Sequence, residues 1–350
     1  MNAKERLDIY LRILREQEIV VTESEIEENW LMLKKRIYRI RYVKLFFSVA
    51  AAVLCLIGLS IGLIAFDSET EMTLITYADA TREDFVNEKD IVLITPIDKQ
   101  MCGNSKMATV IQTIEGNHIV NADTVASRVT DMVKKKEKTS AFNQLIIPIG
   151  KKSRIVLSDS TEIIANSGSR IIYPIAFREN VREIYIDGEA FLTVKKNDRI
   201  PFIVYTHDYE IEVIGTSFNI CSYPSEKKST VVLLNGAINL SGINEEKVTL
   251  KPGEKVDIYE GKIEVPEKVD VKQYVSWIDN ILVYKDEPLE FVLHRLGIYF
   301  GKEFEISQGV KGKSVTGKLE FKEDLFEMLD IISFTASVSF EEQGDKIIVR

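Results

Sequence analysis

Few residues of this 350-residue chain have the types and spacing that catalysis needs. Ser225 and Lys228 form an S-x-x-K tetrad, in which a lysine can activate a nucleophilic serine. This tetrad lies in a polar, turn-like stretch, and the companion S-D-N and K-T-G elements of such hydrolases are missing. Gly150-Lys151-Lys152 lacks the upstream glycine of a phosphate-binding P-loop. We therefore expect no catalytic site.

Patterns for metal binding and disulfide formation are also weak. No histidine has a Cys or His neighbour at metal-ligand spacing; the histidines are His118, His207 and His294. Cys102 and Cys221 could pair, although nothing in their spacing requires a disulfide. We expect no metal, no cofactor and no enzymatic activity.

Two pairs of carboxylates are close in sequence, Asp159 with Glu162 and Asp187 with Glu189. Such pairs usually mark turns and solvated strand faces, and without a pocket they do not indicate acid–base chemistry. Asp187 comes directly before Gly188, and this dipeptide is typical of tight turns. We therefore predict a hairpin turn at Asp187-Gly188.

One uncharged apolar run, Leu45–Phe66, stands apart from the rest of the chain. As a helix, its 22 residues would span about 33 Å, which is enough to cross a bilayer core of about 30 Å. The run is too long, and too far from the start of the chain, for a cleaved signal peptide. It also lacks the polar face that a buried core helix shows to solvent. The sequence predicts a single-pass membrane protein.

Charged residues on either side of this run orient it. Acidic residues follow it, and basic residues crowd its N-terminal side: Lys34, Lys35, Arg36, Arg39, Arg41 and Lys44. Because positive residues stay in the cytoplasm, we expect the N-terminus inside and the C-terminal part outside. The outer part carries 35 basic and 46 acidic side chains, so it lacks the basic surface that nucleic-acid binding needs. The cluster Lys134–Lys138 is typical of a solvated linker.

The first 44 residues are expected to be helical. Apolar residues at helical spacing form one stripe at Leu7, Tyr10, Leu11 and Leu14. A capping pattern at Thr22 and Glu25 predicts a second helix that carries Trp30 and Leu33. So short a segment cannot bury a core of its own, so the stripe indicates a protein partner. Alternatively, the second helix only extends the membrane span.

The region after the membrane span is predicted to be mainly β. Residues 67–142 should form an extension with strands near 91–95, 108–114 and 118–120, followed by a linker. Residues 143–265 show short alternating strands separated by turn residues: Asn166-Ser167-Gly168, Asp187-Gly188, Asn235-Gly236, Pro252-Gly253 and Glu260-Gly261. This pattern favours an antiparallel β sandwich or a β-solenoid-like stack.

The period changes to helical spacing in the last part of the chain, residues 277–350. Leu289, Val292, Leu293 and Leu296 form one helical stripe, and a second contains Leu325, Phe326, Leu329 and Ile332. Strands flank these helices, from Ile281–Lys285 to Lys346–Val349. We expect a small α+β module in the order βαββαβ.

Several phrases of the β region resemble the FecR family of anti-sigma regulators. They cover about 115 residues and stand in the family's order. The residues that carry the resemblance are Asp159 and Thr161, then Gly188, Glu189, Ala190 and Phe191, then Pro201 and Phe202, then Gly215, Thr216, Phe218 and Asn219, and finally Pro252 and Gly253. The module from Trp277 onward is similar to the short N-terminal signalling fold of secretins and TonB-linked receptors.

The sequence departs from the family pattern at the turn near Asp159. Ser160 stands where relatives usually have Gly, and Ile164 and Ala165 replace a usual Trp-Leu pair. Because Ser disfavours positive φ, we expect a different turn type there. Gly188 and Gly215 are expected to be the most sensitive glycines, with Val at either costing about 1–3 kcal/mol if their turns need positive φ.

The resemblance implies a transmembrane relay at the inner membrane, with the outer domains in the periplasm. Its partners would be an outer-membrane TonB-dependent receptor outside and an extracytoplasmic-function sigma factor inside, with site-specific proteases in some relatives. The sigma factor would bind Leu7, Tyr10, Leu11, Leu14, Trp30 and Leu33. An envelope scaffold that binds a surface glycan, or a membrane-tethered hydrolase, would share this layout without the signalling role.

The predicted orientation can be tested with reporter fusions. A reporter that is active only in the cytoplasm should work when fused after Arg41 and be silent when fused after Arg350, because the basic cluster before Leu45 holds the N-terminus inside. An active fusion after Arg350 would contradict both the orientation and the relay.

Overall fold

The computed structural model describes residues 3–16, 27–28, 30–32, 34–35, 73–82, 88–96, 98–102, 107–113, 116–121, 142–242, 246–322, 324–344 and 346–350. Among these residues, no helix is long and apolar enough to cross a membrane. The predicted membrane span, Leu45–Phe66, lies outside the described residues. The chain divides into two compact units, Met1–Glu71 and Met72–Arg350.

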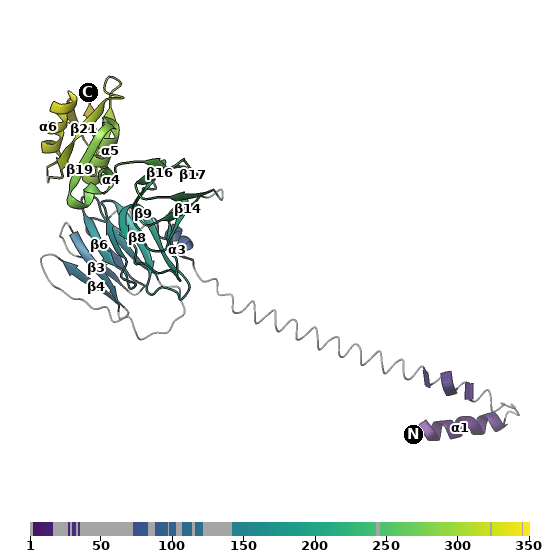
Figure 1. The fold of residues 1–350 in the computed structure, drawn as a ribbon. Coiled ribbons are helices and arrows are strands. Elements are labelled where there is room, and N and C mark those ends of the chain that lie inside the picture. The colour runs from purple at the N-terminus through teal and green to yellow at the C-terminus, as the bar shows by residue number, and fades with distance from the viewer. Residues whose placement is uncertain are drawn as a thin grey trace. The chain divides into compact units, whose positions relative to one another are not determined.

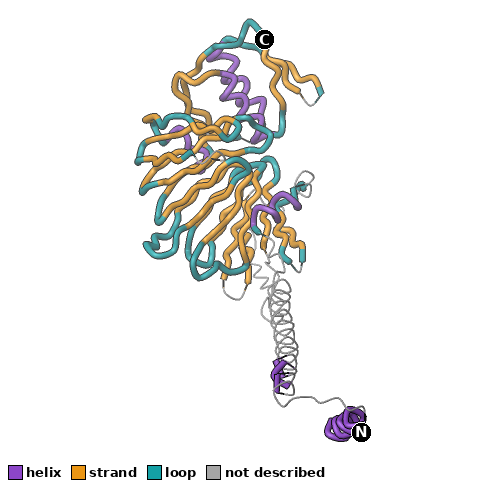
Figure 2. The backbone as a smooth tube through the Cα atoms, turned by 90° about the vertical axis from the view of Figure 1, so that its right-hand side faces the viewer, coloured by secondary structure: helices purple, strands orange, loops and turns teal. Residues whose placement is uncertain are grey.

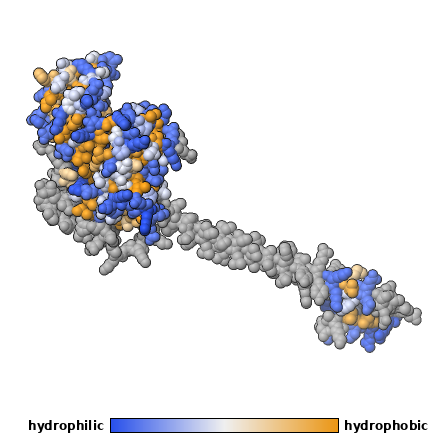
Figure 3. Space-filling view, viewed as in Figure 1, coloured by the Kyte–Doolittle hydropathy of each residue, from blue (hydrophilic) through white to orange (hydrophobic). Residues whose placement is uncertain are grey.

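The first unit contains the predicted N-terminal helix, α1 (Ala3–Glu16). Leu7, Tyr10 and Leu11 are 51%, 65% and 40% exposed on it, and Figure 3 shows apolar side chains among charged ones on its surface. The described positions between 27 and 35 are also helical, and Trp30 is 54% exposed there. The side chain of Leu14 and the whole of Leu33 lie outside the described residues.

In the second unit, two large sheets form a β domain (Figures 1 and 2), and one strand runs through both of them. The first sheet contains the N-terminal half of that strand, β9. In spatial order its strands are β2 (Lys99–Met101), β1 (Val92–Ile94), β5 (Phe142–Ile147), β8 (Ser169–Pro174), β9 (Arg182–Thr193), β10 (Phe202–Tyr205), β11 (Tyr209–Val213), β14 (Ile238–Gly242) and β15 (Lys247–Leu250). Among these pairs, β9 and β10 are parallel.

The second sheet contains the C-terminal half of β9. Its strands are, in order, β4 (Gly116–Asn121), β3 (Met107–Thr113), β6 (Lys152–Val156), β7 (Glu162–Ala165), β9, β12 (Ser217–Ser222), β13 (Lys228–Asn235) and β16 (Glu254–Tyr259), with β17 (Lys262–Ile263) and β18 (Glu267–Lys268) both on β16. Here β3 and β6 are parallel. Strands β1 to β4, from the expected extension, are thus part of the two sheets.

These parallel pairs correct the prediction of an antiparallel sandwich. Strand β9 begins in the first sheet and ends in the second, so the chain must return before β10 can start. Arg182 at the start of β9 donates its backbone N–H to the carbonyl of Pro201, just before β10. The two strands therefore run in the same direction, as in one coil of a solenoid. The two sheets are therefore mixed: most described pairs are antiparallel, and β9–β10 and β3–β6 are parallel.

The predicted hairpin at Asp187-Gly188 is wrong, because both residues lie inside β9. Asp187 pairs with Arg170 in the first sheet, and Gly188 pairs with Ser222 in the second. Gly188 has φ +106° at this crossing. A Cβ built on it would lie 2.4 Å from Oγ of Ser169. Glycine is required here because the strand changes sheets at a close approach, not because the chain turns.

A buried ion pair fixes this crossing. Nη2 of Arg170 lies 2.6 Å from Oδ2 of Asp187, and the side chains are 0% and 1% exposed. Tyr185 donates its hydroxyl to the other carboxylate oxygen of Asp187 at 3.0 Å. On the same outer face, helix α3 (Leu74–Ala80) packs through its buried residues Leu74 and Ala78.

The turn at Asp159 has a conformation that its sequence did not predict. Ser160 has φ +69°, the region expected of the Gly that relatives carry, so the predicted change of turn type is wrong. The Asp159 carboxylate accepts the backbone N–H of Thr161 at 2.9 Å and its hydroxyl at 2.8 Å. Nη1 of Arg182 donates to the same carboxylate at 2.8 Å. These bonds hold the turn with Ser in place of Gly.

The C-terminal module has one strand more than the predicted βαββαβ order. Its elements are β19 (Ile281–Pro288), α5 (Leu289–Phe300), β20 (Glu303–Ile306), β21 (Ser314–Glu320), α6 (Leu325–Ala336), β22 (Phe340–Gln343) and β23 (Lys346–Val349). The last two strands, β22 and β23, form an antiparallel hairpin. The helical stripes are buried as predicted, except that Phe326 is 40% exposed.

A short helical connection joins the two domains. It consists of α4 (Lys272–Val275) and the 3-10 helix η2 (Ser276–Asp279), and it ends at Asn280 with φ +58°. Trp277 in this connection is buried. Each domain has its own apolar core: one lies in the two sheets and the other is within residues 282–349.

Two glycine substitutions separate steric clash from backbone strain in residues 72–350. Gly188→Ala should lower the free energy of unfolding by about 3 kcal/mol, because it adds a clash with Ser169 to a strained φ. Gly253→Ala should cost only about 1 kcal/mol, because Gly253 has φ +84° but no heavy atom near its built Cβ. Urea unfolding measures both values. Equal costs would show that the close approach at Gly188 is unimportant.

Candidate functional site

Two residues of the family phrases, Glu189 and Asn219, meet on the outer face of the second sheet. They lie on the neighbouring strands β9 and β12. Asn219 donates its side-chain amide to Oε1 of Glu189 at 3.1 Å, and Asn166, from the turn after β7, donates to Oε2 at 2.7 Å. All three residues are at least nine-tenths buried. A buried carboxylate needs such donors, because burial without them disfavours its charge.

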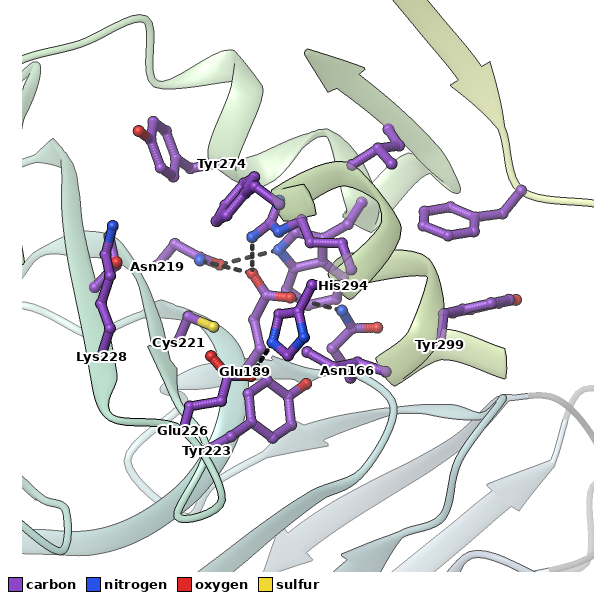
Figure 4. Close-up of a pocket in the computed structure, with 17 residues that line it drawn as sticks. Asn166, Glu189, Asn219, Cys221, Tyr223, Glu226, Lys228, Tyr274, His294 and Tyr299 are labelled. Atoms are coloured by element: carbon purple, nitrogen blue, oxygen red, sulfur yellow. Dashed lines mark hydrogen bonds and ion pairs between the residues drawn. The ribbon is translucent and has the colours of Figure 1, made fainter. Parts of the chain in front are cut away.

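The C-terminal module supplies the charge that opposes Glu189. Arg295 of α5 places Nη2 2.9 Å from Oε1 of Glu189, and these side chains are 12% and 6% exposed. Figure 4 shows the Glu189 carboxylate among these donors. Trp277 donates its indole N–H to the Asn219 side chain at 3.1 Å. We call these residues, Asn166, Glu189, Asn219, Trp277 and Arg295, the Glu189 cluster.

A second cation, Lys152, extends from the β domain toward the module, whereas Arg295 extends from the module toward the β domain. Lys152 of β6 donates Nζ to the backbone carbonyl of Trp277 and, at 2.6 Å, to Oδ1 of Asn280. The same nitrogen lies 5.4, 5.9 and 5.7 Å from the ring centroids of Trp277, Tyr299 and Phe321. Burial lowers the pKa of Lys152 to about 8. Aromatic faces can partly replace the water that this ammonium loses.

Weaker polar contacts surround this pair of cations. His294 of α5 places Nε2 2.9 Å from Oε1 of Glu226. This hydrogen bond raises the pKa of His294. Ser167 donates its hydroxyl to the carbonyl of Ile298 at 3.1 Å and accepts the backbone N–H of Gly150 at 2.8 Å. All of these groups belong to the boundary between the β domain and the module, which we call the junction.

The junction encloses a cavity of about 50 Å³. Its lining includes Glu189, Cys221, Tyr223 and Arg295. That volume can hold a few water molecules, whereas organic ligands usually need roughly 300 Å³ or more. Within the described residues, no group of His, Cys, Asp and Glu is arranged to hold a metal ion. Cys102 and Cys221 are free thiols.

The structure places the other family-phrase residues outside the junction. Asp159 and Thr161 form the turn described above, and Thr216 donates its hydroxyl to the carbonyl of Ala237 at 2.9 Å. A Cβ on Gly215 would lie 2.6 Å from Cα of Lys196, so this glycine is needed for close packing rather than for positive φ. Of the others, three are buried in the core (Ala190, Phe202 and Phe218), Phe191 is half-buried on β9, and three lie between strands (Pro201, Pro252 and Gly253).

The other junction residues have only weak signals in the sequence. Arg295 is a charged residue between the buried residues Leu293 and Leu296 of α5, and Lys152 starts a strand. Neither pattern predicts a contact with a residue more than 100 positions away in the sequence, as both residues make in the structure. Of the predicted partner-binding residues of α1, Leu7, Tyr10 and Leu11 are exposed, and they belong to the first compact unit.

Two family models match parts of the chain. Residues 144–239 match the family model described as FecR protein, and residues 281–349 match the one described as FecR, C-terminal. No curated protein matches the chain.

Two crystal structures of a "putative anti-sigma factor" from Parabacteroides distasonis ATCC 8503 are similar in fold. Each is 23% identical to the chain and has a TM-score of 0.54, covering 59% of this chain and 98% of its own. The two matched domains are the two bodies that meet at the Glu189 cluster. Residues 144–239 and 281–349 are therefore two domains of the FecR family.

Proposed function

We propose that this chain is a membrane-anchored anti-sigma regulator that relays a signal from the periplasm to a sigma factor in the cytoplasm. The two FecR-family domains support this role, and so does the similar fold of the P. distasonis protein. The observation that carries the proposal is α1, a helix on which Leu7, Tyr10 and Leu11 are exposed to solvent.

The orientation follows from the sequence around Leu45–Phe66. A helix over this run would place residues 1–44 in the cytoplasm and residues from 67 onward in the periplasm of the inner membrane. The outer domains would then meet the signalling domain of an outer-membrane TonB-dependent receptor. Site-specific proteases could act on the chain as part of the response.

The cytoplasmic partner would be an extracytoplasmic-function sigma factor. Leu7, Tyr10 and Leu11 are exposed on one face of α1, and a helix with such a face can lie in a partner's apolar groove. We place Leu14, Trp30 and Leu33 on the same binding surface. Large apolar anchors of this kind often dominate the affinity of a helix-in-groove contact.

Leu11→Asp or Trp30→Ala should abolish co-purification of the sigma factor with the full chain. Loss of one such anchor costs about 2 kcal/mol or more, which is at least roughly a thirtyfold loss of affinity. Ile9→Asp is a matched control, because Ile9 is 50% exposed and lies on the opposite side of the same helix. Membrane fractionation checks that all three variants still insert.

The outcome distinguishes the relay from an envelope scaffold. If Leu11→Asp and Trp30→Ala bind the sigma factor as well as the unmodified chain does, α1 is not the binding surface. A regulon that also responds normally in both variants would favour the scaffold. If Ile9→Asp weakens binding equally, the contact surrounds the helix and does not follow the predicted stripe.

A further inference from the structure

The junction joins two bodies that do not share an apolar core. No residue of the C-terminal module belongs to the core of the β sheets, and no β-domain residue belongs to the core of the module. Polar and charged side chains make hydrogen bonds and ion pairs across the contact. Interfaces of this kind between domains commonly permit relative motion.

The charged contacts are reciprocal, so they form or break together. Arg295 of the module inserts beside Glu189 of the β domain, and Lys152 of the β domain lies near the aromatic rings of Tyr299 and Phe321 of the module. Movement of α5 away from the sheet would unpair Glu189 and expose these rings at the same time. A buried charge without its partner is strongly disfavoured, which makes partly docked arrangements rare.

The connection between the domains can absorb such a movement. It is short, and it ends at Asn280, whose left-handed backbone stands directly before β19. Its contacts with the β domain include the Trp277 indole on Asn219 and the Lys152 ammonium on the Trp277 carbonyl. Release of the module would therefore also release the connection.

We propose that the C-terminal module is a latch that is either docked or released, and that release at the Glu189 cluster is the step that converts a periplasmic signal. The proposal rests on the proposed function and adds its regulation. A partner that binds the released module more tightly than the docked one shifts the chain toward release. Release uncovers Glu189 in the centre of β9, the strand shared by both sheets.

Two positions allow the docked state to be locked by a disulfide. A Cβ built on Gly301, at the end of α5, would lie 3.8 Å from Cβ of Ile149 in the β domain. Disulfides need Cβ atoms about 3.5–4.5 Å apart, so Ile149→Cys with Gly301→Cys meets this condition. Each single cysteine is a control, because Gly301 has φ +67° and a side chain there is strained. Peptide mapping verifies that the bond joins 149 and 301.

The first measurement uses a protein of residues 72–350. It follows hydrogen exchange at residues 269–280, which include the connection. Arg295→Leu should speed exchange there on the order of tenfold or more, while both cores stay protected. Arg350→Leu is the matched control, because it removes an exposed pair with Glu341 in the same module. The oxidised lock should restore slow exchange to Arg295→Leu. Equal exchange in the oxidised and reduced lock would overturn the latch, even if Arg295→Leu unfolds the module.

The second measurement is made in cells with the full chain. Transcripts of the genes controlled by the sigma factor that binds residues 1–44 should change at least several-fold in Arg295→Leu and remain unchanged in Arg350→Leu. The oxidised lock should return them to the unmodified level, and a thiol reductant should reverse this effect. If transcript levels are the same with the lock oxidised and reduced, release of the latch is not the signalling step. If no sigma factor binds residues 1–44, the proposed function fails, and hydrogen exchange still tests the latch.

Discussion

The buried carboxylate of Glu189 is the constraint on which the arrangement of the outer domains depends. It lies on the outer face of a sheet, where a charge would normally meet water, but the C-terminal module covers it. Two donors come from the β domain, Asn166 and Asn219, and the only cation shown to bind it among the described residues is Arg295 of the module. The β domain is therefore electrostatically complete only when the module is docked.

The strand that carries Glu189 explains why this position matters to the whole β domain. Strand β9 crosses from one sheet to the other at Gly188. On one side of the crossing, Asp187 is neutralised by Arg170 within the β domain, and on the other side Glu189 is neutralised from outside it. The Asp187 carboxylate thus stabilises the β domain itself, whereas the pairing of the Glu189 carboxylate depends on the position of the C-terminal module.

Local sequence patterns predicted the elements but not the contacts between them. Alternation identified strands such as β1, β3 and β4, and stripes such as Leu289 to Leu296 identified helices α5 and α6, because an element that is buried on one face has apolar residues at regular spacing. The Asp187-Gly188 dipeptide led to the wrong prediction of a hairpin, because a strand that changes sheets and a hairpin turn both require glycine at a strained position. The phrase that contains Glu189 could be recognised, but Arg295 is 106 residues away and no local pattern joins them.

A double-mutant cycle between Glu189 and Arg295 tests the central claim most directly. The free energy of unfolding of residues 72–350 is measured for the unmodified protein, Glu189→Gln, Arg295→Leu and the double variant. We predict a coupling energy of about 2 kcal/mol or more, because each single change leaves a buried partner unsatisfied. Additive costs, with a coupling below about 0.5 kcal/mol, would show that the module does not complete the β domain and would contradict the account.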